Sequence, residues 1–353
     1  MKLCMFRIDT PVGPFDRFGL VTLDGGPADM IESARNGAGS VVDVNFAYAA
    51  MQAERGEPNP TGRAAAFCPA DLQGFAELYG TDRALLEEIA DWAAGRGDAA
   101  GPRGEAIHWR LTDIALMPPI GRVPVLRDFA AFEDHLENTF GKMGLKIPPA
   151  WYEQPTAFKG NSTTIFGHDT TVPWPRYTKK LDYELELAAV IGRPTKDVDI
   201  DHAADAILGY TLLNDFSARD TQRGEMNVST GPYKGKDFAW GLGPWIVTPD
   251  EFGDPATLQM AVRIDGEVWA TSTPGPMQWS FPEAISYTSQ DELLTVGEVL
   301  GSGTVNSGCG FEIDRWIVPG AVVELEADRI GVLRHHVAHP AGEPIRWRRQ
   351  QKG

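Results

Sequence analysis

Alternating apolar and polar positions dominate the chain and predict many short strands. Residues 1–22 alternate in two segments, CMFRI and FGLVTL. From Leu181 onward the sequence is also typical of strands, in YELELAAVIG, AILGYTLLND, GPWIVTP, LQMAVRIDGEVWATS and AVVELEADRIGVLRH, and turn signals such as Asp265-Gly266 punctuate it. Many strands with few helices favour an α+β, mostly β fold. We expect a mixed β-roll or barrel rather than a doubly wound sheet.

Apolar residues three and four positions apart predict a small number of helices. The longest cover residues 44–54 and 83–94. In a third, Phe129, Phe132 and Leu136 would share one face, with Asp128 just before the helix. Shorter helices are predicted at 201–208, 217–223 and 281–289.

Two adjacent prolines suggest a division of the chain into domains. Pro118 and Pro119 end the segment IHWRLTDIALMPPI, and a chain of 353 residues is long enough for about two domains. We predict a smaller N-terminal α+β domain over 1–120, a catalytic domain over 121–345 and a tail over 346–353.

Composition narrows the classes of partner. The chain has 49 acidic and 32 basic residues, a formal net charge of −17, which argues against nucleic acid and anionic membrane surfaces. Its three cysteines (Cys4, Cys68 and Cys309) lack a CxxC spacing, so neither a disulfide framework nor a structural zinc site is expected. The first apolar run is too short for a signal peptide, and no segment approaches the ~20 apolar residues of a membrane span. We expect a soluble, cytoplasmic protein.

Carboxylates on one strand face are the first candidate chemistry. In YELELAAV the period of two places Glu184 and Glu186 on one face, which Asp182 would join. Asp215 ends the apolar strand AILGYTLLND where the chain reverses. A solvated acidic face and a helix cap at Asp215 are the plain alternatives. Clustered carboxylates repel one another, so a hard divalent cation with oxygen ligands would explain such a group.

Basic and neutral polar side chains follow close behind. Arg219 and Gln222 would share one face of the short helix, and Lys236 lies in the glycine-rich loop GPYKGKDF. A surface arginine and a solvated lysine are the alternatives. The segment HHVAH (His335, His336 and His339) is expected to be a surface or strand-edge feature rather than a metal site.

The segments LDYELELAAVIG, NDFSARDTQ, GKDF, GSGTVNSGCGFE and PGAVVELEADRIGVL together resemble the fumarylacetoacetate hydrolase family over residues ~120–335. The resemblance implies a homodimer and a divalent cation, Mg²⁺ or alternatively Mn²⁺ or Ca²⁺. It assigns the metal ligands to Asp128, Glu184, Glu186 and Asp215. It assigns the catalytic positions to His135 as general base, Glu312 as its partner, Lys236, Arg219 and Gln222, and the substrate-binding positions to Thr304, Phe158, Ala130 and Met226.

The same resemblance implies a reaction class. The expected substrate is a small anionic oxo acid of 1,3-diketone or acylpyruvate type, fumarylacetoacetate-like or a product of aromatic ring cleavage. Water activated by His135 would attack the acyl carbonyl, and the enolate half would leave. Ala130, Met226 and Phe158 replace tyrosines of fumarylacetoacetate hydrolase itself, which favours a different substrate. A decarboxylase, isomerase or hydratase using the same site, and a non-enzymatic metal-binding β-protein, are the alternatives.

Overall fold

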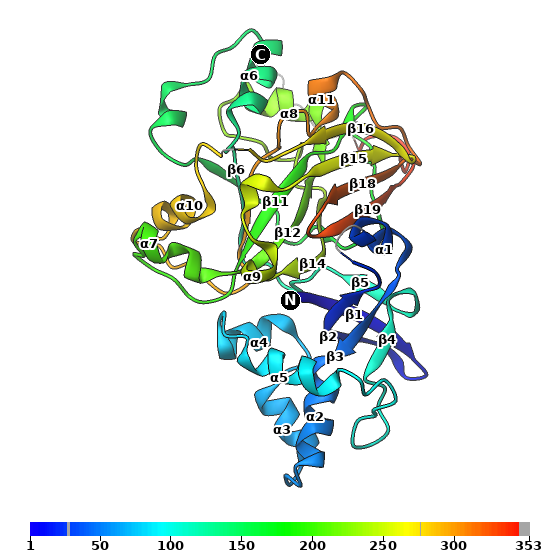
Figure 1. The fold of residues 1–353 in the computed structure, drawn as a ribbon. Helices are drawn as coiled ribbons and strands as arrows, with labels where there is room; N and C mark the ends of the chain where they lie inside the picture. Colours follow the sequence, from blue (N-terminus) through cyan, green and yellow to red (C-terminus); the bar gives the residue numbers. More distant parts are fainter. Residues whose placement is uncertain (27–28, 276, 346–353) are drawn as a thin grey trace.

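A large mixed sheet runs through most of the molecule (Figure 1). The computed structural model describes residues 1–26, 29–275 and 277–345. The strand order is β4-β3-β2-β1-β14-β12-β11-β17-β6-β7, with β5 beside β1 and β8 beside β14. Its strands are β1 (Lys2–Thr10), β2 (Gly13–Leu23), β3 (Gly39–Asp43), β4 (His108–Arg110), β5 (Ala115–Met117), β6 (Leu126–Phe129), β7 (Ala157–Gly160), β8 (Ile165–Phe166), β11 (Leu185–Ile191), β12 (Ile207–Asp215), β14 (Trp240–Val247) and β17 (Val299–Gly301).

A second sheet and a short ribbon complete the β structure. The five-stranded sheet has the order β16-β15-β18-β19-β9, and β10 pairs with β13. These strands are β9 (Thr170–Val172), β10 (Leu181–Asp182), β13 (Ser217–Ala218), β15 (Met260–Ile264), β16 (Glu267–Ser272), β18 (Val322–Ala327) and β19 (Gly331–Val337). The expected α+β, mostly β class is confirmed, and in the described residues the strand order does not close into a ring.

Two groups of helices lie at opposite ends of the molecule, and the others lie between them (Figure 1). Helices α2–α5 lie together at one end, whereas α6, α8 and α11 meet at the other (Figure 1). Their bounds are α1 (Met30–Asn36), α2 (Val44–Glu54), α3 (Pro60–Phe67), α4 (Leu72–Tyr79), α5 (Ala84–Ala93), α6 (Glu133–Lys142), α7 (Ile200–Ala203), α8 (Arg219–Met226), α9 (Pro249–Phe252), α10 (Phe281–Thr288) and α11 (Gly310–Ile313). No helix in the described ranges is both long and apolar enough to cross a membrane.

The N-terminal strands extend the sheet that carries the candidate site. Strand β1 pairs antiparallel with β14, with Lys2 opposite Val247. Apolar side chains on the two faces of the sheet form two buried clusters, one of which reaches from β1 to β11, β12 and β17. The boundary near residue 120 stays a prediction, and the predicted tail over 346–353 lies outside the described residues.

Three local predictions were wrong. Phe129 lies in β6 beside Asp128, not on a helical face, because that segment pairs with β7 and β17 before α6 begins at Glu133. The helix predicted from residue 217 begins at Arg219, after a short strand. His335 is fully buried in β19, where its ring packs against the bare backbone of Gly241.

Candidate metal centre and active site

Four carboxylates converge from neighbouring strands of the large sheet, two near the carboxyl ends of β6 and β12 and two at the amino end of β11. Asp128 lies in β6, Glu186 in β11 and Asp215 at the end of β12. Glu184 lies just before β11, where its backbone forms an isolated antiparallel β-bridge with Cys309. One carboxylate oxygen from each lies within 4.8 Å of the others, and all four residues are buried. Strands 11 and 12 are adjacent, and β17 joins β11 to β6, so sheet pairing brings Asp128 to the other three.

Gly301 makes this convergence possible. It lies on β17 directly between the strands that carry Asp128 and Glu186. A Cβ atom at Gly301 would lie 2.7 Å from Asp128 Oδ1 and 2.9 Å from Glu186 Oε2, distances that real Cβ contacts essentially never show. The absence of a side chain therefore leaves the space in which these two oxygens face each other.

Two buried cations share the cluster. The Lys236 ammonium contacts the carboxylates of Glu184 and Asp215. Arg219 Nη2 lies 2.7 Å from Glu184 Oε1. If all groups are ionised, two positive charges against four carboxylates leave 2 − 4 = −2. With the buried Asp182 carboxylate, which also pairs with Arg219, the balance is 2 − 5 = −3, so a divalent cation would offset most of the negative charge.

The carboxylate oxygens themselves fit such a cation. Asp128 Oδ1, Glu186 Oε2 and Asp215 Oδ1 are buried and have no hydrogen-bond partner in the described part of the chain. Buried polar groups are normally paired, so three orphan oxygens in one place call for a ligand. The set contains oxygen donors only, which suits Mg²⁺, Mn²⁺ or Ca²⁺ better than softer ions.

The pKa shifts of the four carboxyl groups reflect the same excess of buried negative charge. Burial raises the pKa of Asp128 to about 6, and burial together with neighbouring carboxylates raises the pKa values of Glu186 and Asp215 well above their usual range. Burial also opposes ionisation of Glu184, but Lys236 and Arg219 outweigh it and hold the pKa of Glu184 below its usual range. Without a cation, the cluster therefore disfavours full ionisation.

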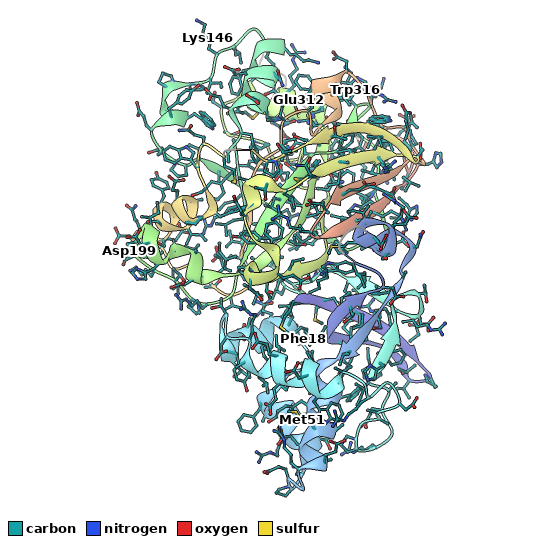
Figure 2. All side chains as sticks on the ribbon, viewed as in Figure 1. Phe18, Met51, Lys146, Asp199, Glu312 and Trp316 are labelled. Carbon is teal, nitrogen blue, oxygen red and sulfur yellow. The ribbon has the colours of Figure 1, made fainter. Side chains whose placement is uncertain are left out.

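A histidine–glutamate pair lies next to the cluster. His135 on α6 places Nδ1 2.8 Å from Oε2 of Glu312 on α11. Glu312 accepts hydrogen bonds from the backbone N–H of Ser307 (3.1 Å) and the side chain of Asn138 (3.2 Å). Burial raises the pKa of Glu312, but His135 and these donors hold it below its usual value. Figure 2 shows Glu312 where α6, α8 and α11 come together.

Asp182 links the two parts of the site, a role the sequence reasoning missed. Its carboxylate accepts hydrogen bonds from Arg219 Nε (2.8 Å) and from the backbone N–H groups of Gly310 (2.8 Å) and Phe311 (3.0 Å). It does not join the acidic face formed by Glu184 and Glu186. Instead it ties the arginine of the cluster to α11, the helix that carries Glu312.

Three further predicted residues contact the carboxylate cluster or its two cations. Thr304 Oγ1 donates to Glu186 Oε1 at 3.5 Å, and the Phe158 ring centroid lies 5.8 Å from Lys236 Nζ. Gln222 accepts a hydrogen bond from Arg219 Nη1 at 3.2 Å.

Two substrate-binding assignments make no hydrogen bond to the four carboxylates in the described part of the chain. The Ala130 carbonyl accepts a hydrogen bond from Trp151. Met226 ends α8 with an exposed side chain. A role in substrate binding for these two residues stays a prediction.

Comparisons with known proteins place this site in a family. The description "Fumarylacetoacetate (FAA) hydrolase C-terminal" matches residues 124–338, which include every residue of the candidate site. The chain therefore belongs to the fumarylacetoacetate hydrolase family, whose members are enzymes.

Two curated relatives come from different bacteria. Protein Rv2993c of Mycobacterium tuberculosis is 33% identical over 268 residues, covering 76% of this chain and 93% of the relative. The oxaloacetate tautomerase YisK of Bacillus subtilis is 28% identical over 258 residues, covering 72% and 82%.

Solved structures agree on the fold along nearly the whole chain. A putative HpcE protein from Mycobacterium smegmatis has a TM-score of 0.67 and 25% identity, covering 97% of this chain and 100% of that one. A structure described as 2-hydroxyhepta-2,4-diene-1,7-dioate isomerase from Mycobacterium marinum has a TM-score of 0.62 and 24% identity, covering 97% and 100%, and shows the fold alone.

Proposed function

We propose that the protein is a divalent-metal-dependent enzyme that hydrolyses a carbon–carbon bond in an anionic 2,4-dioxo acid of the acylpyruvate type. The observation that carries the proposal is the His135–Glu312 pair beside a buried cluster of four carboxylates. A general base next to an all-oxygen cation site suits reactions that pass through an enolate.

The cluster would hold the cation through Asp128, Glu184, Glu186 and Asp215, and the cation would supply Lewis-acid polarisation of the two substrate oxygens. His135 acts on water. With its proton on Nδ1 facing Glu312, Nε2 can accept a proton, and the buried carboxylate stabilises the imidazolium that forms. The water oxygen bonds to the acyl carbon, the bond between that carbon and C3 breaks, and C3 takes the proton back from His135.

The two cations and Gln222 complete the site. Lys236 has three N–H donors, and two are directed to Glu184 and Asp215, so the third remains for the oxyanion that develops on the acyl carbon. The Gln222 carbonyl accepts from Arg219, which leaves its NH₂ group to donate. Arg219 adds the positive charge that an anionic substrate needs in a chain of formal net charge −17.

Tautomerisation or isomerisation of a 2-oxo acid is the second candidate. It is favoured by the name of the Bacillus subtilis relative, an oxaloacetate tautomerase. The same residues would serve this reaction: His135 would move a proton to or from C3 without activating water. The two candidates therefore differ in bond cleavage, not in the site.

Product analysis in deuterated water separates them. Acylpyruvates of increasing chain length and oxaloacetate are incubated with the protein and Mg²⁺ or Mn²⁺, and products are followed by NMR. We expect pyruvate and a carboxylic acid, lost by about 10²–10⁴-fold in His135→Ala, as is typical for removal of a general base. Deuterium uptake at C3 without cleavage, faster than in a protein-free control and slowed in His135→Ala, would establish the second candidate. Absence of both cleavage and exchange across the series would contradict the proposal.

A further inference from the structure

We propose a second metal site, for zinc, at the His135–Glu312 pair itself. Three chemically different ligands converge there: His135 Nδ1, Cys309 Sγ and Glu312 Oε2 lie within 4.8 Å of one another. The Nδ1–Oε2 separation is 2.8 Å, and Sγ lies 3.4 Å from Oε2. Inhibition by zinc at this site rests on the proposed function, whereas zinc binding itself does not.

The distances are close to those that zinc requires. Zinc bonds of ~2.0–2.3 Å to nitrogen, oxygen and sulfur place tetrahedral ligand atoms roughly 3.3–3.8 Å apart. The Cys309–Glu312 separation of 3.4 Å already falls in this range, and the His135–Glu312 separation of 2.8 Å must open by about half an ångström. Both Cys309 and Glu312 belong to one short segment around α11, so they move together.

Ligand type separates this site from the carboxylate cluster. An imidazole, a thiol and a carboxylate form a set that favours Zn²⁺, whereas four carboxylates favour Mg²⁺ or Mn²⁺. His135 Nδ1 has no hydrogen-bond partner with correct geometry in the described residues, although Glu312 lies near it. In the tautomer that carries its proton on Nε2, the Nδ1 lone pair faces Glu312 Oε2 and Cys309 Sγ, and zinc would replace the Nδ1 proton of the other tautomer.

The charges of the three ligands also suit a zinc ion, and their exposure indicates how zinc would reach them. On binding, the Cys309 thiol gives its proton to solvent and becomes a thiolate, and this thiolate and the Glu312 carboxylate balance the two charges of zinc. The Glu312 side chain is 1% exposed, whereas the His135 side chain is 13% exposed. Because His135 Nδ1 itself is buried, zinc would enter by displacement of the partly exposed His135 side chain, and a water molecule would fill the fourth position.

Zinc at this site would stop the proposed reaction. A neutral imidazole that donates its Nδ1 lone pair to a metal carries its proton on Nε2. In that state Nε2 of His135 cannot accept a proton from water. Zinc would therefore inhibit without displacing the cation from Asp128, Glu184, Glu186 and Asp215.

The test is zinc binding to chelator-treated protein in the presence of saturating Mg²⁺, measured by competition with a zinc-sensitive dye. We expect one zinc per wild-type chain and a loss of affinity of at least about 100-fold in Cys309→Ser, more than the usual effect of a residue outside the ligand shell. Cys68→Ser, at another buried cysteine, is the matched control and should bind like wild type. With Co²⁺ as the probe, the near-ultraviolet thiolate charge-transfer band should appear in wild type and Cys68→Ser only.

Equal zinc affinity in wild type and Cys309→Ser, or a cobalt spectrum without the thiolate band, would overturn the site. If Cys309→Ser fails to fold by circular dichroism, His135→Ala provides the same test, since it removes another ligand at a partly exposed position. Turnover is measured separately. Zinc that binds through Cys309 without inhibiting would support the site and contradict His135 as the base of the proposed function.

Discussion

Gly301→Ala tests whether the carboxylates must face each other across empty space to bind a cation. The variant removes no ligand. Its Cβ would meet Asp128 Oδ1 at 2.7 Å and Glu186 Oε2 at 2.9 Å, and ordinary contact begins at 3.4 Å. The two carboxylates must therefore retreat by 3.4 − 2.7 = 0.7 Å and 3.4 − 2.9 = 0.5 Å.

Such displacements exceed what a metal site tolerates. Ligand distances within about 0.2 Å of ideal are characteristic of real sites, so moving two of the four ligands by more than twice this amount should cost at least about 100-fold in affinity, or roughly 2.7 kcal/mol. Overpacking should also lower the free energy of unfolding by about 1–3 kcal/mol. The protein should still fold, because the added group is a single methyl.

Isothermal titration of chelator-treated protein with Mn²⁺ measures the affinity directly. Thermal unfolding provides a second readout, since Mn²⁺ at 100 times its dissociation constant should stabilise wild type by about 2.7 kcal/mol and should barely affect the variant. Gly121→Ala is the matched control, because a Cβ there meets nothing within 4 Å. A Mn²⁺ dissociation constant for Gly301→Ala within about threefold of wild type would refute the reasoning.

Three further predictions address the other parts of the site and the core. Asp182→Asn should lower kcat/KM by about 10²-fold through misplacement of Arg219, with Mn²⁺ affinity unchanged; unchanged steady-state kinetics would contradict a positioning role. Glu312→Gln should reduce turnover by about 10²–10⁴-fold, again with normal Mn²⁺ titration, and full activity would remove it from the mechanism.

Burial lowers the pKa of His168 to about 4 in the folded protein. A histidine in the unfolded chain has a pKa of ~6.5 and therefore takes up its proton first as the pH falls. The contribution of His168 to the free energy of unfolding is present above about pH 6.5 and is lost as pH falls. Between pH 7.5 and 5.0 the free energy of unfolding of wild type should fall by about 2 kcal/mol more than that of His168→Asn. Asparagine keeps an acceptor for the Arg334 N–H. Equal decreases for the two proteins, measured by urea unfolding, would contradict this prediction.

Part of the site could be read from local pattern. A strand has a period of two, so Glu184 and Glu186 were predicted on one face, and Asp215 was recognised at the end of a buried strand. Asp128 and His135 came from the family resemblance. Their position beside the cluster depends on the parallel pairing of β6 with β17, which are about 170 residues apart. Such long-range pairing cannot be inferred from the local sequence of either segment.

Asp182 shows why the rest could not be predicted. Continuous alternation places it with Glu184 and Glu186, but β10 ends at Asp182 and β11 begins only at Leu185. The break between them turns the Asp182 carboxylate toward the backbone of Gly310 instead. Where the strand is interrupted the regular alternation of faces no longer applies, and nothing in YELEL marks the interruption.

The misplacement of His335 has a similar physical cause. The segment HHVAH is polar, which predicted a surface position, but β19 lies inside the second sheet and His335 is fully buried. Gly241 provides the room, since a Cβ there would lie 2.3 Å from the His335 ring. The partner that accommodates the ring is distant in the sequence, so burial could not be inferred from the segment alone.

The central claim is that Asp128, Glu184, Glu186 and Asp215 together hold one divalent cation. Calorimetric titration of chelator-treated protein with Mn²⁺, in wild type and in Glu186→Gln, tests it most directly. Glutamine keeps the size of the side chain and removes the charge that repels its neighbours in the absence of a cation. We predict one Mn²⁺ per wild-type chain and no measurable binding in Glu186→Gln. The same stoichiometry and affinity in both proteins would contradict the claim.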